Sequence, residues 1–185
     1  MNRREFLVAP LLLVGLVEPV VTTRAPAWSR DKSDPRWVQG SVVVPALAEQ
    51  VWKRLERADQ WAAVFTDIKA LRVAFRDADE WKLKVETHTF PCGAHDYHVH
   101  LSGPYSSTIF IEAPGISGIA YLKAREVKRA RPSDPVETRV HYSLFVEMKK
   151  PMPWFGNEAE LRKKQEAMVE KNLVDLERAF APPRA

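Results

Sequence analysis

The chain lacks most of the signatures that would assign it to a class at once. Cys92 is its only cysteine, which excludes an internal framework of disulfides. The sequence has no Gly-rich phosphate loop, no nucleophile elbow and no zinc-protease helix, and it has no internal repeat or low-complexity block. Outside the N-terminal region, no apolar run is long enough to cross a bilayer. Nucleotide-binding, α/β-hydrolase and metalloprotease activities are therefore not indicated.

The composition instead predicts one domain with an ordinary apolar core. The chain has 185 residues, and 45% of them are hydrophobic. The formal net charge is +4, from 28 basic and 24 acidic residues, and the two signs are mixed along the chain. Lys123–Arg131 is the only clearly basic tract. Since nucleic-acid binding usually needs a denser concentration of positive charge, we expect no nucleic-acid partner.

The first residues resemble a bacterial export signal. Arg3 and Arg4 stand just before Phe6-Leu7, which is the core pattern of a twin-arginine signal. The apolar run Leu7–Val17 follows, and Ala25-Pro26-Ala27 provides the small residues that a signal peptidase favours.

This pattern divides the chain into three parts. We expect a twin-arginine signal peptide at 1–27, a linker at 28–36 and a folded domain at 37–182, with the mature protein in the periplasm. The alternative is an uncleaved N-terminus that anchors the protein in the membrane. The apolar run is short for a membrane span, Pro10 interrupts it, and Pro19 follows soon after its end.

The remainder of the chain is mainly strands, followed by one long helix. Leu47–Arg57 and Trp61–Phe65 have the spacing of short helices. Seven segments have strand composition or alternation: Trp37–Val44, Ala70–Arg76, Trp81–Phe90, His95–Leu101, Tyr105–Glu112, Ile119–Arg129 and Thr138–Lys149. Turn residues separate them, so the pattern predicts an α+β fold with an antiparallel sheet.

Asn157–Phe180 predicts the long C-terminal helix. Asn157 is a suitable N-cap, and Glu160 is placed to complete a capping box. Apolar residues and one amide recur at helical spacing, and Pro182-Pro183 ends the pattern. These positions are Leu161, Met168, Val169, Asn172, Leu173, Leu176 and Phe180. A helix of this length needs a broad surface to pack on, and a curved sheet of about seven strands would provide it.

One short motif resembles a known superfamily. Ser41–Ala46 leads into Val51-Trp52-Lys53-Arg54-Leu55, and Trp61 follows. This opening is similar to that of the START-like, polyketide cyclase (SRPBCC) superfamily. The resemblance implies a helix-grip fold with a cavity between the sheet and the long helix. It also implies an apolar or amphipathic small-molecule ligand, lipid-like or polycyclic, bound without a cofactor. A cyclase- or dehydratase-like enzyme acting on a polyketide-type substrate in the same cavity is the alternative.

The resemblance and the strand alternation together suggest candidate ligand contacts. These are Trp61, Phe65, Tyr97, Phe110, Tyr121, Arg125, Tyr142 and Met168. In Ile119–Arg129 the alternation does not choose between Tyr121/Lys123/Arg125 and Ala120/Leu122/Ala124 as the inward set. We expect no integral membrane segment in the mature protein, although a transient membrane contact would suit such a carrier.

Four histidines near the middle of the chain raise the question of a metal site. A three-residue loop at Cys92 would place His88 opposite His98 and Glu86 opposite His100, on the polar face of the sheet. Two imidazoles and a carboxylate can bind zinc or copper, but a solvated surface pair is the simpler interpretation. We therefore expect no metal ion, and no residues are assigned to catalysis.

Overall fold

The structure is a computed structural model that describes residues 36–90, 93–149 and 158–181. Its elements follow one another in the order strand, two short helices, six strands and one long helix. They are β1 (Val38–Val44), α1 (Ala48–Leu55), η2 (Ala58–Ala63), β2 (Ile68–Arg76), β3 (Glu80–Thr87), β4 (Gly93–Leu101), β5 (Ser106–Ala113), β6 (Ile116–Glu126), β7 (Thr138–Met148) and α2 (Glu158–Phe180). The predicted signal peptide, Asn157 and the two final prolines lie outside the described residues.

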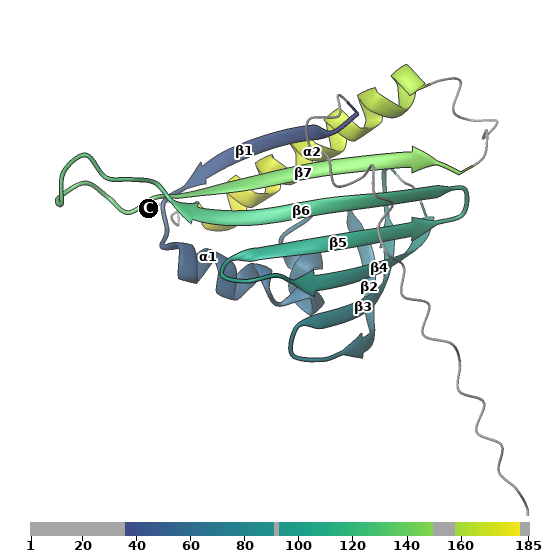
Figure 1. The fold of residues 1–185 in the computed structure, drawn as a ribbon, viewed down its shortest axis with the longest axis horizontal. Coiled ribbons are helices and arrows are strands. Elements are labelled where there is room, and N and C mark those ends of the chain that lie inside the picture. The colour runs from purple at the N-terminus through teal and green to yellow at the C-terminus, as the bar shows by residue number, and fades with distance from the viewer. Residues whose placement is uncertain (1–35, 91–92, 150–157, 182–185) are drawn as a thin grey trace, which may run out of the picture.

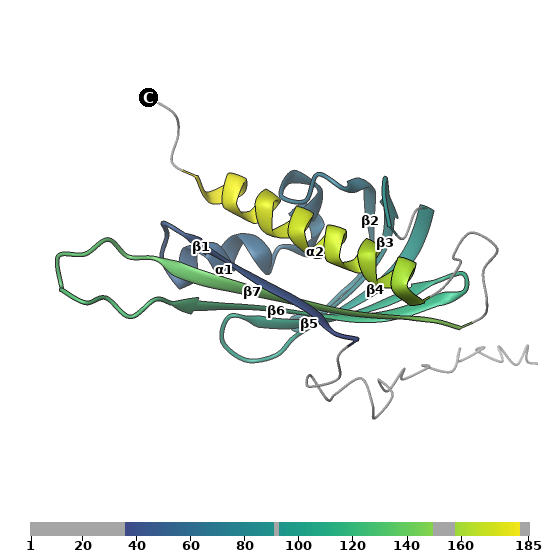
Figure 2. The same cartoon turned by 90° about the horizontal axis from the view of Figure 1, so that it is seen from above.

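The seven strands form one antiparallel sheet in the order β1-β7-β6-β5-β4-β3-β2. β1 joins the sheet beside the last strand, and the other strands follow their chain order. The sheet curves around α2, with α1 and η2 on the same side (Figures 1 and 2). The predicted α+β helix-grip fold is therefore confirmed. None of the described helices is both long and apolar enough to cross a membrane.

Strand alternation separates an inner face, toward α2, from an outer face. In β3 the inward side chains Trp81, Leu83 and Val85 are 2%, 1% and 1% exposed. The inward sets expected in β4 and β7 are also confirmed, because Tyr97 and Tyr142 are buried in the same core cluster. A period of two places every second residue on one face, which is why these strands could be interpreted from sequence.

The structure resolves the alternative that the sequence left open in β6. Ala120, Leu122 and Ala124 are 0%, 1% and 2% exposed and form its inward set. Tyr121 and Arg125 consequently lie on the outer face. The small alanines leave room for the helices behind the sheet, and α1 contacts this strand.

α2 crosses closely over β1, and Gly40 makes this approach feasible. A Cβ at Gly40 would clash with the Leu173 side chain and would lie 3.3 Å from Cγ1 of Val169. The buried face of α2 is more polar than a packed core requires: Gln165, Asn172 and Asp175 are 3%, 7% and 3% exposed. Each buried polar group needs a partner, because an unsatisfied group lowers stability.

Asp175 obtains its partners from the connection between η2 and β2. Its Oδ2 accepts hydrogen bonds from the backbone N–H and the Oγ1 of Thr66, both at 2.8 Å. Nη1 of Arg178 donates to its Oδ1 at 3.0 Å. This buried carboxylate thus fastens α2 to the segment that leads into the opposite edge of the sheet.

Candidate functional site

A small cavity lies between the inner face of the sheet and α2. Its volume is about 40 Å³. Its lining is mainly apolar and comes from η2, the turn after it, all strands from β2 to β7, and α2. The lining residues are Trp61, Phe65, Asp67, Ile68, Thr87, Tyr97, Ile109, Ile111, Ala120, Leu122, Tyr142, Met168 and Asn172.

Five of the residues suggested as ligand contacts line this cavity. They are Trp61, Phe65, Tyr97, Tyr142 and Met168. η2 positions the indole of Trp61, whose Nε1 donates to the Leu55 carbonyl at 2.8 Å. The ring of Phe65 meets this indole edge-on, with centroids 6.1 Å apart. The structure thus brings these five side chains together, and ligand contact by them remains a prediction.

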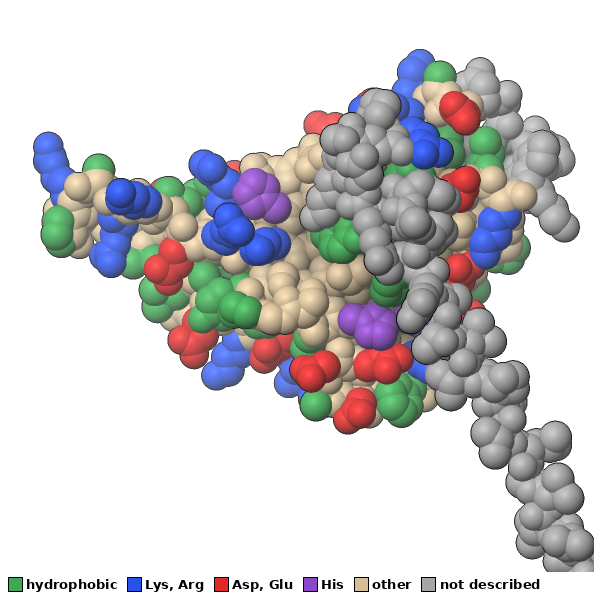
Figure 3. Space-filling model, viewed as in Figure 1, with side chains coloured by type: hydrophobic (Ala, Val, Ile, Leu, Met, Phe, Trp, Pro, Cys, Tyr) green, Lys and Arg blue, Asp and Glu red, His purple; other side chains and the backbone are tan. Residues whose placement is uncertain are grey.

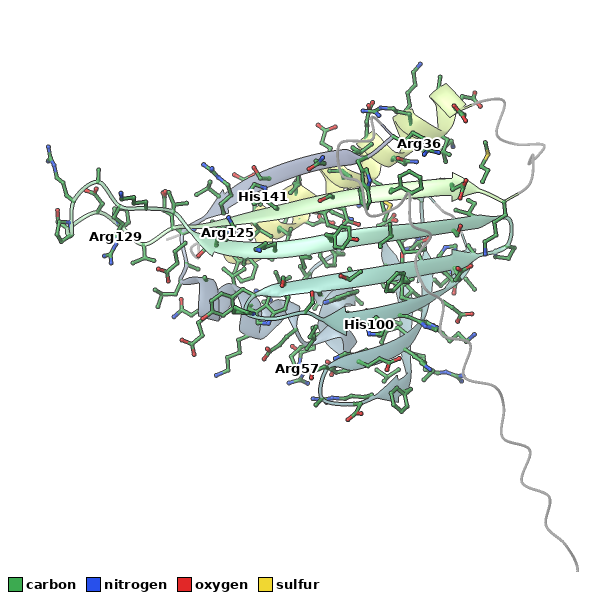
Figure 4. The ribbon with its side chains drawn as sticks, viewed as in Figure 1. Arg36, Arg57, His100, Arg125, Arg129 and His141 are labelled. Carbon is green, nitrogen blue, oxygen red and sulfur yellow. The ribbon has the colours of Figure 1, made fainter. Side chains whose placement is uncertain are left out.

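The other three suggested residues lie on the outer face of the sheet. Phe110 and Tyr121 pack against a cluster formed by Trp37, Ile119 and Phe145. Arg125 is exposed on the same face (Figure 4). Alternation requires this placement, because the neighbours of Phe110, Ile109 and Ile111, point inward.

Two buried phenols provide hydrogen-bonding groups inside the cavity. Burial raises the pKa of Tyr142 to about 12, although a side-chain hydrogen bond with Asn172 opposes part of this shift. The pKa of Tyr97 is raised even further, first by burial and then by the nearby Tyr142 and Asp67. Charged phenolates are disfavoured in an apolar site, so both groups stay protonated at neutral pH and can donate a hydrogen bond.

Asp67 also lines the cavity, although no motif in the sequence marks it as a site residue. It is 5% exposed. Its Oδ1 accepts hydrogen bonds from the backbone N–H of Thr89 at 3.0 Å and from the Thr89 hydroxyl at 2.7 Å. Its backbone carbonyl accepts a further bond from the N–H of His88 at 2.9 Å. The carboxylate therefore stabilises the exit from β3 and at the same time borders the apolar space.

These bonds to Asp67 explain why the predicted pairing of β3 with β4 is wrong. Asp67 lies just before β2, and its oxygens accept hydrogen bonds from the backbone N–H groups of residues 88 and 89. These groups therefore do not pair with β4, and β3 ends at Thr87. The connection to β4 is then longer than three residues, and the register shifts. His98 lies opposite Lys82, and His100 lies opposite Glu80. Neither predicted pair, His88 with His98 or Glu86 with His100, is formed.

His95 leaves the histidine cluster altogether. It points to the inner face and is 4% exposed, and its Nε2 lies 3.1 Å from the hydroxyl of Thr87. Its ring stacks near that of Tyr97, with centroids 6.4 Å apart. The sequence could have indicated the inward placement of His95, because His95, Tyr97 and Val99 occupy alternate positions of one strand and therefore share a face. Among the described residues no group of three or more metal-ligating side chains gathers, and Cys92 lies outside them.

Comparisons with known proteins identify the fold. No family model matches the chain, and a search of curated proteins found no match. A START superfamily protein from Mycobacterium smegmatis matches with a TM-score of 0.58 at 17% identity, over 78% of this chain and 96% of that one. The protein TTHA0849 from Thermus thermophilus matches with a TM-score of 0.62 at 15% identity, over 78% and 96% of the two chains.

An enzyme is among the solved structures that match. The Zhui aromatase/cyclase from Streptomyces sp. R1128 has a TM-score of 0.61 at 16% identity, over 78% of this chain and 90% of that one. At such identities the likeness concerns the fold, and the residues of the site have to be judged by their own geometry. The chain therefore has the helix-grip fold that is shared by a START-superfamily protein and an aromatase/cyclase.

Proposed function

We propose that this domain binds an apolar or amphipathic small molecule, lipid-like or polycyclic, in the cavity between the sheet and α2. The observation that carries the proposal is the lining: a continuous apolar surface into which a few hydrogen-bonding groups converge, Tyr97, Tyr142, Asn172 and Asp67. Ligand sites combine these two features, because apolar contact provides affinity and a few polar groups fix orientation. The fold supports the proposal, since it places a curved sheet against a single helix.

The size of the cavity sets a condition on binding. A volume of about 40 Å³ has room for a few water molecules, whereas sites for drug-sized ligands are on the order of 300–1,000 Å³. Binding of a polycyclic molecule therefore requires α2 and the side chains beneath it to move outward. Met168 is half-buried at this boundary, and its unbranched side chain can change rotamer readily.

A pair of alanines on β6 allows a matched test. Ala120 lines the cavity, whereas Ala124 is equally buried on the same face but does not line it. We expect the purified domain to bind the apolar fluorophore N-phenyl-1-naphthylamine saturably. Ala120→Val should weaken that binding at least tenfold, and Ala124→Val should leave it unchanged. Equal affinity in both variants, or no saturable binding by the wild type, would contradict the proposal.

A cyclase- or dehydratase-like reaction is the second candidate. Its support is the pair of protonated phenols beside the Asp67 carboxylate, which could donate and accept protons at a carbonyl substrate. Of the polar residues among the suggested ligand contacts, Tyr97 and Tyr142 line the cavity, and Tyr121 and Arg125 do not. Mass spectrometry of a linear poly-β-ketone incubated with the protein would detect loss of water. Tyr142→Phe should abolish this loss while probe binding persists.

We also propose that the protein is exported by the twin-arginine route and acts in the periplasm. The support is the sequence around Arg3 and Arg4 and the small residues that end at Ala27. Changing both arginines to lysine should leave unprocessed precursor in the cytoplasm. If that variant reaches the periplasm in equal yield, the route is wrong. If the wild type is exported but keeps its N-terminus, the membrane-anchor alternative applies.

A further inference from the structure

Four basic side chains gather at one end of the outer face of the sheet. Lys123 lies directly opposite His141, and Arg125 lies directly opposite Arg139, on the neighbouring strands β6 and β7. We call these four residues the basic patch. All four are exposed, and their neighbours along each strand are buried except Glu126, an exposed carboxylate beside Arg125. Figure 3 shows basic side chains beside a histidine on this face, and Figure 4 labels Arg125 and His141 there.

The arrangement is unfavourable for the isolated protein. Side chains directly opposite each other on antiparallel strands have Cβ atoms about 5 Å apart, and like charges at that separation destabilise the sheet. In the part of the chain that the structure describes, no ion pair neutralises Lys123, Arg125 or Arg139. Elsewhere on the outer face, residues directly opposite each other carry opposite charges. Lys84 lies opposite Asp96, for example, and its Nζ is 2.5 Å from the Asp96 Oδ1. An external anion would relieve the repulsion.

The surroundings of the basic patch provide further contacts for a phosphate-bearing surface. Ser41 lies opposite His141 and places a hydroxyl beside the cations, whereas the hydroxyl of Ser106, opposite Lys123, donates to the Ser102 carbonyl. Val43 lies opposite Arg139 and is 38% exposed, which adds an aliphatic contact at the same level. The connection between β6 and β7 projects beyond the sheet and carries exposed Lys128, Arg129 and Arg131 against Asp134 and Glu137, so it is positively charged on balance (Figures 1 and 4).

These features favour a membrane over a nucleic acid. A single-stranded nucleic acid is usually held by exposed aromatic rings on which its bases stack. The aromatic rings along this face pack against one another instead: Trp37 and Phe145 are only 4% and 1% exposed, and Tyr121 and Phe110 are partly buried against them. A group of cations with an exposed aliphatic side chain suits the phosphate and glycerol region of a bilayer instead, where each Lys or Arg adds about fivefold to the affinity for anionic lipid.

We propose that the basic patch and the basic β6–β7 connection form a docking surface for a membrane that contains anionic phospholipids. This surface shares no residue with the cavity, so it does not depend on the identity of the cavity ligand. Docking would leave the α2 side of the molecule facing away from the bilayer, because the patch side chains lie on the outer face of the sheet and α2 covers the other face (Figure 2).

Vesicle flotation with the folded domain tests the proposal. We expect the protein to float with phosphatidylglycerol-containing vesicles at low salt, to dissociate at high salt, and not to float with pure phosphatidylcholine. Arg125→Gln/Arg139→Gln should lower the partition by about 25-fold, because two cations are lost. Its thermal midpoint should be equal or higher, since a like-charge pair has been removed, so failure to fold cannot explain the loss.

The matched control is Lys53→Gln/Arg72→Gln, which removes the same charge from exposed positions on α1 and β2. It should retain most of the binding. Equal loss in the patch and control variants would overturn the proposal, because only net charge would matter. Displacement from vesicles by inorganic phosphate at millimolar concentration would overturn it in favour of a site for soluble phosphate. Binding of an oligonucleotide through the same arginines, without vesicle binding, would overturn it in favour of nucleic acid.

Discussion

Met168→Phe is the substitution that most directly separates a ligand cavity from a packed core. Met168 lines the cavity from α2 and is half-buried. Filling a cavity of about 40 Å³ recovers at most about 1 kcal/mol of unfolding free energy, at roughly 24 cal/mol per Å³. The rigid ring loses some of this gain through its restricted rotamers. We therefore expect the free energy of unfolding to change by less than about 1 kcal/mol.

The alternative makes a different prediction for the same variant. If position 168 were surrounded by well-packed atoms, a larger ring would force neighbouring side chains out of their rotamers, and stability would fall by about 1–3 kcal/mol. Urea denaturation followed by tryptophan fluorescence distinguishes the two outcomes. In a parallel titration, Met168→Phe should bind the apolar fluorophore at least tenfold more weakly than the wild type.

Leu176→Ala provides the control at the packed end of the same helix. Leu176 is fully buried and does not line the cavity. Its truncation should lower stability by about 2–5 kcal/mol while the folded protein keeps the affinity of the wild type for the probe. Destabilisation by Met168→Phe as large as that by Leu176→Ala, or full probe binding by both variants, would show that Met168 does not border a ligand cavity.

Two further predictions concern buried polar groups. The pKa of Tyr142 is raised by burial to about 12, from an ordinary value of 10.0, so the stability that its protonated phenol contributes is present below pH 10.0 and is lost as the pH rises toward 12. Urea denaturation at both ends of that pH interval measures the free energy of unfolding. Over this rise in pH, Tyr142→Phe should lose about 2–3 kcal/mol less of it than the wild type does, and an equal loss in both proteins would contradict the burial of the phenol. Asp175→Ala should lower stability by about 2–4 kcal/mol, because it leaves the N–H and the hydroxyl of Thr66 without their acceptor. Glu177→Ala, at an exposed position of the same helix, should change stability by less than about 0.5 kcal/mol, and similar losses in the two variants would show that Asp175 does not fasten α2.

Much of the architecture could be predicted because it depends on local pattern. The alternation of Trp81, Leu83 and Val85 identifies both the strand and its buried face, and the helical spacing of Leu161, Val169 and Leu176 identifies α2. The element order then leaves few ways to bury these surfaces, and a sheet wrapped around one helix is one of them. The inward placement of Tyr97 and Tyr142 follows from the same alternation.

The partners of the polar residues could not be predicted in this way. The pairing of β3 with β4 depends on Asp67, a residue of another segment, which binds the backbone at 88 and 89 and ends β3 early. The inward set of β6 was ambiguous because both Tyr121 and Leu122 are apolar enough to be buried. Phe110 was assigned to the cavity on its aromatic character, although its neighbours Ile109 and Ile111 occupy the inner face.

The sequence by itself determined which segments form strands and helices and which face of most of them is buried, because periodicity is a property of neighbouring residues. Only the tertiary structure decided which distant polar groups meet. Asp175 reaches Thr66 across 109 positions of the chain. Lys123 and Arg125 meet His141 and Arg139 only when β6 and β7 pair in one register. Register and crossing geometry result from the simultaneous packing of all elements, and a single stretch of sequence does not contain that information.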